Sequence, residues 1–262
     1  MSVQTYRRPV QAIFLIISII LLGGIARYCP FIGVQQIAGA IGSGLIDEAF
    51  DAGTIRGFSR LTIVVGGFTL FVIVFGRVWC GWICPFGTIL SAANALKLPV
   101  QERSPPRILQ GYSFKYELLA VFIGATMIFG YPVFCQVCPV GALYRTAGFQ
   151  TFDLAVIPGL TVVFISVLFV LIYHRRFWCK SICPLGALTA ILDKVSAFRV
   201  LVDEDTCIEC MVCQRECPMD ILVIEDSIRR GHRTVPTGEC FRCGRCIDVC
   251  PKDALSFSFK YG

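Results

Sequence analysis

The chain has 262 residues, of which 55% are hydrophobic and only 16% are charged. In soluble domains about a quarter of the residues are charged. This composition and a mean hydropathy of +0.70 therefore argue against an ordinary soluble protein. Much of the net charge of +6 comes from Lys and Arg that flank the apolar segments described next. It therefore needs no nucleic-acid partner to explain it, and we expect none.

Four apolar runs follow one another in the first 195 residues. Each has 16 to 20 residues, near the low end of what crosses a ~30 Å hydrocarbon core. A soluble core that buries all four is the alternative, but this segment has too little polar surface to enclose them. We therefore predict four transmembrane helices in a domain of residues 1–195, and we interpret the first run as a retained helix rather than a signal peptide. The runs are residues 10–26, 61–76, 118–134 and 154–173.

The basic residues near the ends of these runs are unequally distributed. Ten lie on the side that carries both termini, and four lie on the other side. By the positive-inside rule, we predict a multi-pass protein of the inner (cytoplasmic) membrane with both termini in the cytoplasm. Membrane lipid with anionic headgroups is then an expected partner. The ten are Arg7, Arg8, Arg77, Lys97, Arg103, Arg107, Lys115, Arg175, Arg176 and Lys180, and the four are Arg27, Arg56, Arg60 and Arg145.

A Cys-Pro step follows each apolar run, and the successive steps are 55, 54 and 45 residues apart. This period predicts a repeated unit made of one span, a turn at the Cys-Pro step and a further apolar stretch. Proline is favoured at the first position of a helix, so Pro85 and Pro184 are predicted to open short helices with the preceding cysteine at the cap. The steps are Cys29-Pro30, Cys84-Pro85, Cys138-Pro139 and Cys183-Pro184.

Because successive spans alternate in direction, the repeat divides its cysteines between two faces of the membrane. Four of them follow the second and fourth runs and are predicted to share the inner face. Four thiolates are what one [4Fe–4S] cluster needs, so we predict one there, its negative charge offset by nearby Arg and Lys. A zinc site or unliganded apolar cysteines are the alternatives. The four are Cys80, Cys84, Cys179 and Cys183.

The remaining cysteines of this region, Cys29, Cys135 and Cys138, are predicted to lie on the outer face. Two interpretations stay open. Either Cys135 and Cys138 form a disulfide, or all three cysteines bind a further cluster that another ligand completes. A c-type haem is excluded because Pro139, not His, follows Cys138. Without an outer cluster, a quinone would have to bridge the ~30 Å core.

The last part of the chain carries one cysteine pattern twice: Cys207-x2-Cys210-x2-Cys213-x3-Cys217-Pro218 and Cys240-x2-Cys243-x2-Cys246-x3-Cys250-Pro251. In two-cluster ferredoxins the fourth cysteine of each run binds the other cluster. A pair of zinc sites is the alternative. We predict a small cytoplasmic α+β domain of the bacterial 2[4Fe–4S] ferredoxin type over residues 196–262. One cluster is assigned to Cys207, Cys210, Cys213 and Cys250, and the other to Cys240, Cys243, Cys246 and Cys217.

This order of spans, Cys-x3-Cys-Pro motifs and double ferredoxin resembles the NapH-type membrane ferredoxins of periplasmic nitrate reductase systems. The resemblance covers nearly the whole chain, and the run over residues 240–250 is similar to the family's closing run. It implies a subunit of a quinol-oxidising chain that serves other redox subunits, such as cytochromes or iron–sulfur proteins. The three outer cysteines depart from the usual pattern. The family's C-x3-C-P-x-G-A-L stretch is matched by Cys179, Cys183, Pro184, Gly186, Ala187 and Leu188.

Together these features predict an integral membrane iron–sulfur subunit that transfers electrons. It would link the cytoplasmic ferredoxin clusters, the quinone pool and a redox partner at the outer face. The alternative is an accessory protein that matures or regulates another metalloenzyme. No catalytic residue is assigned, because the sequence contains no phosphate-binding glycine pattern and no Ser–His–Asp set.

Overall fold

The computed structural model describes residues 2–20, 52–95, 113–130, 133–147, 157–173, 176–228, 233–235 and 238–259, and every structural statement below concerns these residues. The predictions for Cys29 and for residues 21–26 of the first apolar run fall outside them. For Cys135 the structure describes the backbone alone.

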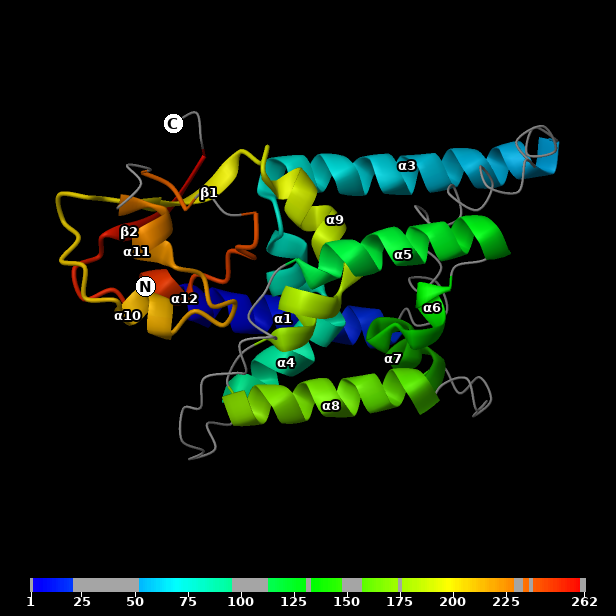
Figure 1. The fold of residues 1–262 in the computed structure, drawn as a ribbon, viewed down its shortest axis with the longest axis horizontal. Helices are drawn as coiled ribbons and strands as arrows, with labels where there is room; N and C mark the ends of the chain where they lie inside the picture. Colours follow the sequence, from blue (N-terminus) through cyan, green and yellow to red (C-terminus); the bar gives the residue numbers. More distant parts are fainter. Residues whose placement is uncertain are drawn as a thin grey trace.

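Long helices form one part of the molecule, on the right of Figure 1. The axes of α3, α5 and α8 are roughly parallel in Figure 1, with α5 running opposite to the other two, and each helix contains most of one of the apolar runs. Within the described ranges, no helix is both long and apolar enough to cross a membrane. The four transmembrane helices therefore stay a prediction. The long helices are α1 (Val3–Ile20), α3 (Ala52–Phe75), α5 (Phe114–Phe129) and α8 (Ile157–Tyr173).

Short helices follow the Cys-Pro steps and pack between the long ones. Cys84 and Cys183 adopt extended backbone angles, and Pro85 and Pro184 are the first residues of the helices that follow. The predicted helix starts are therefore confirmed. Each is preceded by a turn of π-helix, which the sequence did not predict. The pairs are η3 (Trp79–Ile83) with α4 (Pro85–Ala95), and η6 (Trp178–Ile182) with α9 (Pro184–Asp193).

The third described Cys-Pro step has the same form. Cys138 is also extended, with φ −66° and ψ 122°, and it separates α6 (Phe134–Val137) from α7 (Pro139–Ala147). Both helices contact α8, and α7 also contacts α4. At all three described steps, an extended cysteine is thus followed by a short helix that begins with proline, and these helices pack among the long ones.

The other part of the molecule, on the left of Figure 1, is built on a two-stranded antiparallel sheet. Strand β1 (Phe198–Val202) pairs with β2 (Leu255–Phe259), so that Phe198 lies opposite Phe259. Val200, Val202 and Leu255 point into a core that also contains parts of both cysteine runs. Three helices of one turn each complete this α+β part. They are α10 (Val212–Arg215), α11 (Val223–Asp226) and α12 (Arg245–Asp248).

The two cysteine runs of this part have matching backbone turns. Two positions in the first run and one just after it have a left-handed φ, and each recurs 33 residues later, in or just after the second run. Left-handed turns reverse the chain within a few residues, which lets closely spaced cysteines face one common space. Of these positions only Gly244 is a glycine, and a side chain there would meet Val3. The pairs are Glu209 with Arg242, Met211 with Gly244, and Asp220 with Asp253.

The N-terminal helix joins the two parts. The backbone N–H groups of Val3 and Gln4 donate to the carboxylate of Asp248, at 2.6 and 3.0 Å, and thereby satisfy donors at the start of α1. The side-chain amide of Gln4 donates to the carbonyl of Cys243 at 2.8 Å. Consistent with these contacts, the N-terminus lies beside α12 in Figure 1. The helical part and the cysteine-rich part are therefore in direct contact.

Candidate iron–sulfur sites

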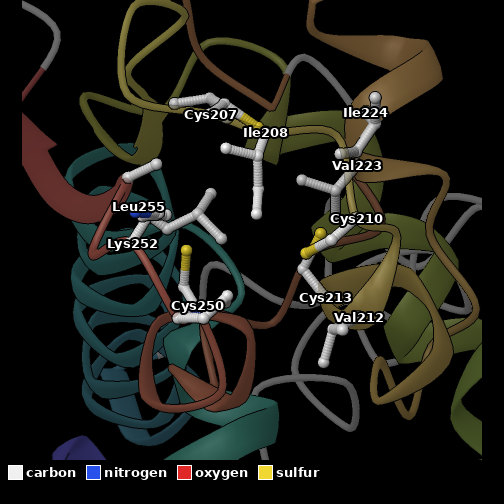
Figure 2. Close-up of a pocket in the computed structure, with 13 residues that line it drawn as sticks. Cys207, Ile208, Cys210, Val212, Cys213, Val223, Ile224, Cys250, Lys252 and Leu255 are labelled. Carbon is white, nitrogen blue, oxygen red and sulfur yellow. The ribbon is translucent and has the colours of Figure 1, made fainter.

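Four cysteines that come from both runs line one cavity of about 400 Å³, part of it open to solvent. They are the four that the sequence analysis assigns to a single cluster. Figure 2 shows them around a common space that Ile208, Val223 and Leu255 also border. The four are Cys207, Cys210, Cys213 and Cys250.

The other four cysteines of the runs line a second cavity, of about 420 Å³, part of it open to solvent. This set again equals the set assigned to one cluster. Burial raises the pKa of the Cys217 thiol to about 12 and that of Cys240 to about 11. Without a ligand these thiols stay protonated at neutral pH, so binding of a metal group has to release their protons. The four are Cys217, Cys240, Cys243 and Cys246.

The four cysteines of the Cys-x3-Cys-Pro motifs lie where the two parts of the molecule meet. Cys80 and Cys179 pack against the core of the cysteine-rich part. Cys84, Cys179 and Cys183 pack against the helical core. Burial is the main cause that raises the pKa of Cys84 and Cys183, and the thiols of Cys80 and Cys179 are near enough to raise both further. The structure thus brings these four partly buried side chains into one neighbourhood.

Two glycines allow this close approach. A Cβ added at Gly81 would lie 2.5 Å from the carbonyl oxygen of Phe241, and one added at Gly87 would lie 2.5 Å from that of Cys80. The first glycine brings the motif turn against the second cysteine run. The second glycine lets α4 fold back over the preceding π-helical turn. The sequence analysis gave neither glycine a role.

Cys138 packs against the same helical core as Cys84 and Cys183, and it contributes to the raised pKa of Cys183. Helices α6 and α7 contact α8, and a Cβ added at Gly159, near the start of α8, would lie 3.4 Å from the carbonyl oxygen of Cys138. The predicted place of Cys138 on the outer face stays a prediction.

Positive charge is concentrated around this junction. Among the described residues, six buried side chains are basic and only two are acidic, a surplus of four positive charges. Buried charge is costly unless an opposite charge lies close to it. A [4Fe–4S] cube with four thiolates carries about two negative charges, so anionic clusters suit this environment. The basic residues are Arg7, Arg77, Lys115, Arg176, Lys180 and Arg242, and the acidic ones are Asp193 and Glu239.

The guanidinium groups of this set also retain hydrogen-bonding capacity. The buried Nε–H groups of Arg77, Arg176 and Arg242 have no partner among the described residues. Arg176 lies over the ring of Phe241, at 4.6 Å from its centroid, between the motif turn and the second run. Hydrogen bonds to cluster or thiolate sulfur would satisfy such donors. The donor set therefore fits iron–sulfur clusters at the junction.

Ion pairs and hydrogen bonds connect the two parts around the same cysteines. Arg242 donates to Asp193 at 2.5 Å and to Ser196 at 2.6 Å. The indole N–H of Trp82 donates to the carbonyl of Arg242 at 2.9 Å, and Lys180 pairs with Asp220 at 3.1 Å. The sequence analysis missed Asp193, Glu239 and Arg242, because only the folded chain brings them to the junction.

Within the described part of the chain, no three or more His, Cys, Asp or Glu side chains converge so that they could hold a metal ion, and this holds for the cysteine quartets as well. His174 and His232, the two histidines of the chain, lie outside that part.

Comparison with known proteins identifies iron–sulfur domains over most of the chain. A family model described as a 4Fe-4S binding domain matches residues 57–98, 118–149 and 156–201. A second, described as a 4Fe-4S dicluster domain, matches residues 199–251. The match over residues 118–149 includes Cys135 and Cys138, the cysteines that the sequence analysis considered a departure from the family pattern. The chain therefore contains 4Fe-4S-binding domains.

Several relatives are ferredoxin-type proteins. The ferredoxin-type protein NapH of Haemophilus influenzae is 29% identical over 199 residues, which are 73% of this chain and 66% of that protein. The methylamine utilization ferredoxin-type protein MauN of Methylorubrum extorquens is 28% identical over 92% of this chain and 77% of its own length. An uncharacterized protein of Methanocaldococcus jannaschii is 28% identical over 83% of this chain and 86% of its own.

No solved structure matches the chain. The iron–sulfur domains and the named relatives agree with the cysteine motifs described above. The homologues of the chain thus include ferredoxin-type proteins named NapH and MauN, and its 4Fe-4S domains fit a NapH-type polyferredoxin.

Proposed function

We propose that the chain is an electron-transfer subunit that holds three [4Fe–4S] clusters, two in a ferredoxin domain of residues 196–262 and a third in the motif region of residues 1–195. The observation that carries this proposal is the group of four partly buried motif thiols at a junction with surplus positive charge. Once bound, the clusters would supply one-electron carriers. The proposed ligands of the third cluster are Cys80, Cys84, Cys179 and Cys183.

The two cavities of the cysteine-rich part, which we now call the ferredoxin part, differ in their surroundings. This difference suggests the order in which the clusters follow one another. Cys210, in the first cavity, is exposed, so this cavity is accessible to an external redox protein. The second cavity includes Phe241, which lies against Gly81 of the motif region. We propose that the chain holds its clusters in the order first cavity, second cavity and motif site, with the direction of electron flow left open.

We further propose that the helical part lies in the inner membrane, with membrane lipid around it and both termini in the cytoplasm. Large apolar side chains on three long helices are exposed, which a lipid environment would explain. Examples are Ile63 on α3 at 72%, Ile128 on α5 at 80% and Phe164 on α8 at 69% exposure. A membrane position would give the motif cluster access to a quinone, and a redox protein at the outer face would complete the chain of carriers.

Iron content of the purified chain tests the number of clusters. With four irons per cube, three clusters correspond to about twelve irons and as many acid-labile sulfides per chain. EPR spectra at a series of poised potentials then separate the centres. About eight irons would contradict the motif cluster. About sixteen would support a fourth cluster, on Cys29, Cys135 and Cys138 with one further ligand.

The proposed topology predicts that a cysteine added after Gly262 is shielded in intact cells. The reason is the ten-to-four distribution of Lys and Arg around the apolar runs. An impermeant maleimide should label this cysteine only after the membrane is permeabilised, as judged against the unmodified chain treated in the same way. Equal labelling before and after permeabilisation would place the C-terminus outside and disprove the model.

A further inference from the structure

Arg77 has an unusual position in this fold. It follows the turn at Gly76 that ends α3, and its side chain is fully buried. Its backbone N–H donates to the carboxylate of Asp193 at the end of α9, at 3.2 Å. These contacts keep the guanidinium at the junction between the motif region and the second cysteine run.

The guanidinium of Arg77 connects the ligand loops of two proposed clusters. Its Nη2 donates to the carbonyl of Cys179, a proposed ligand of the motif cluster, at 3.4 Å. Its Nη1 donates to the carbonyls of Gly238 and Glu239, at 3.4 and 3.2 Å. These two residues directly precede Cys240, a proposed ligand of the second ferredoxin cluster. One side chain thus contacts both loops.

A buried acidic group lies beside this contact. The carboxylate of Glu239 accepts a hydrogen bond from Arg77 Nη1 at 2.7 Å and one from the phenol of Tyr116 at 3.0 Å, and it pairs with Lys115. Because water is excluded, each of these charges acts through a low effective dielectric constant. The positive charge of Arg77 and the negative charge of Glu239 therefore act in opposite directions on the electrostatic potential at nearly the same place.

We propose that Arg77 is a positioning residue that holds the Cys179 turn against the Cys240 run and raises the reduction potential of the adjacent clusters, while Glu239 lowers it. This inference rests on the proposed function. Reduction adds a negative charge to a cluster, so a fixed positive charge nearby favours the reduced form and a fixed negative charge disfavours it. Local charge and hydrogen bonding are known determinants of iron–sulfur potentials.

The test compares the potentials of two neutral variants that should shift in opposite directions. Arg77→Gln should decrease the equilibrium constant for reduction of the motif cluster at least tenfold, which for one electron is 59 mV. Glu239→Gln should increase it. Arg199→Gln is the matched control, since this arginine lies on β1 and contacts only the carbonyls of Lys194 and Ser196 in the described hydrogen bonds. Redox-poised EPR of the full chain gives the potentials.

Iron content of each variant separates positioning from failure to fold. Opposite shifts at unchanged iron support the proposal, whereas no shift or shifts in the same direction overturn it. If Arg77→Gln loses iron, the reduction potentials of two other variants test the proposal instead. These are Arg77→Lys, which retains the charge, and Glu239→Gln. If the unmodified chain holds only about eight irons, the proposed function fails, and the potential of the second ferredoxin cluster still tests the role of Arg77.

Discussion

Replacing Cys213 by Ser should remove one cluster and loosen the ferredoxin part. Its thiol lines the first cavity and its side chain is buried in the core with Val202 and Val223. The apolar core around the two cavities is small, and small domains need metal groups or cross-links to stay folded. The variant should therefore lose about four of twelve irons and become sensitive to limited proteolysis within residues 196–262.

A suitable control is Ser256→Ala, which changes an exposed side chain on β2 and touches neither cavity. It should retain all its iron and its protease resistance, because exposed substitutions away from special features change stability by only about 0.5 kcal/mol. A Cys213→Ser protein with full iron content and unchanged proteolysis would show that the first cavity does not need this ligand.

Local motifs made the ferredoxin part the most predictable region of the chain. The spacing of each cysteine run limits where three of its thiols can lie. The exchange of the fourth cysteine between runs, inferred from the pattern, agrees with the two cavities, which contain Cys250 and Cys217 with the opposite runs. The starts of α4 and α9 were predictable for a similar reason, since proline at the first helical position depends only on local backbone geometry.

The junction could not be predicted in the same way. The partnership of Arg77 with Glu239 joins residues 162 positions apart, and that of Asp193 with Arg242 depends on how α9 meets the second run. Neither pair has a local sequence pattern. The packing of Cys138 against the helical core was also not predicted, because alternation of spans assigns faces but does not describe short helices, such as α6 and α7, that pack against the spans.

The proposed motif cluster predicts a large effect of Cys179→Ser. Among the four motif cysteines, Cys179 packs against both cores, so its sulfur lies between the helical part and the ferredoxin part. Serine preserves the backbone carbonyl that accepts from Arg77 and nearly preserves the side-chain volume. We therefore expect the variant to stay folded, to lose about four of twelve irons, and to lose the EPR signal of one centre.

Cys138→Ser is the matched comparison, since this cysteine packs against the same core and is not a proposed ligand of the motif cluster. If four cysteines suffice for the motif cluster, Cys138→Ser should keep about twelve irons while Cys179→Ser keeps about eight. Both variants should retain the EPR signals of the two ferredoxin clusters. Retention of these signals would show that any loss of iron is confined to the motif region. Twelve irons in Cys179→Ser would exclude this thiol as a ligand. A loss in Cys138→Ser would instead extend the site toward α7, because Cys138 directly precedes that helix.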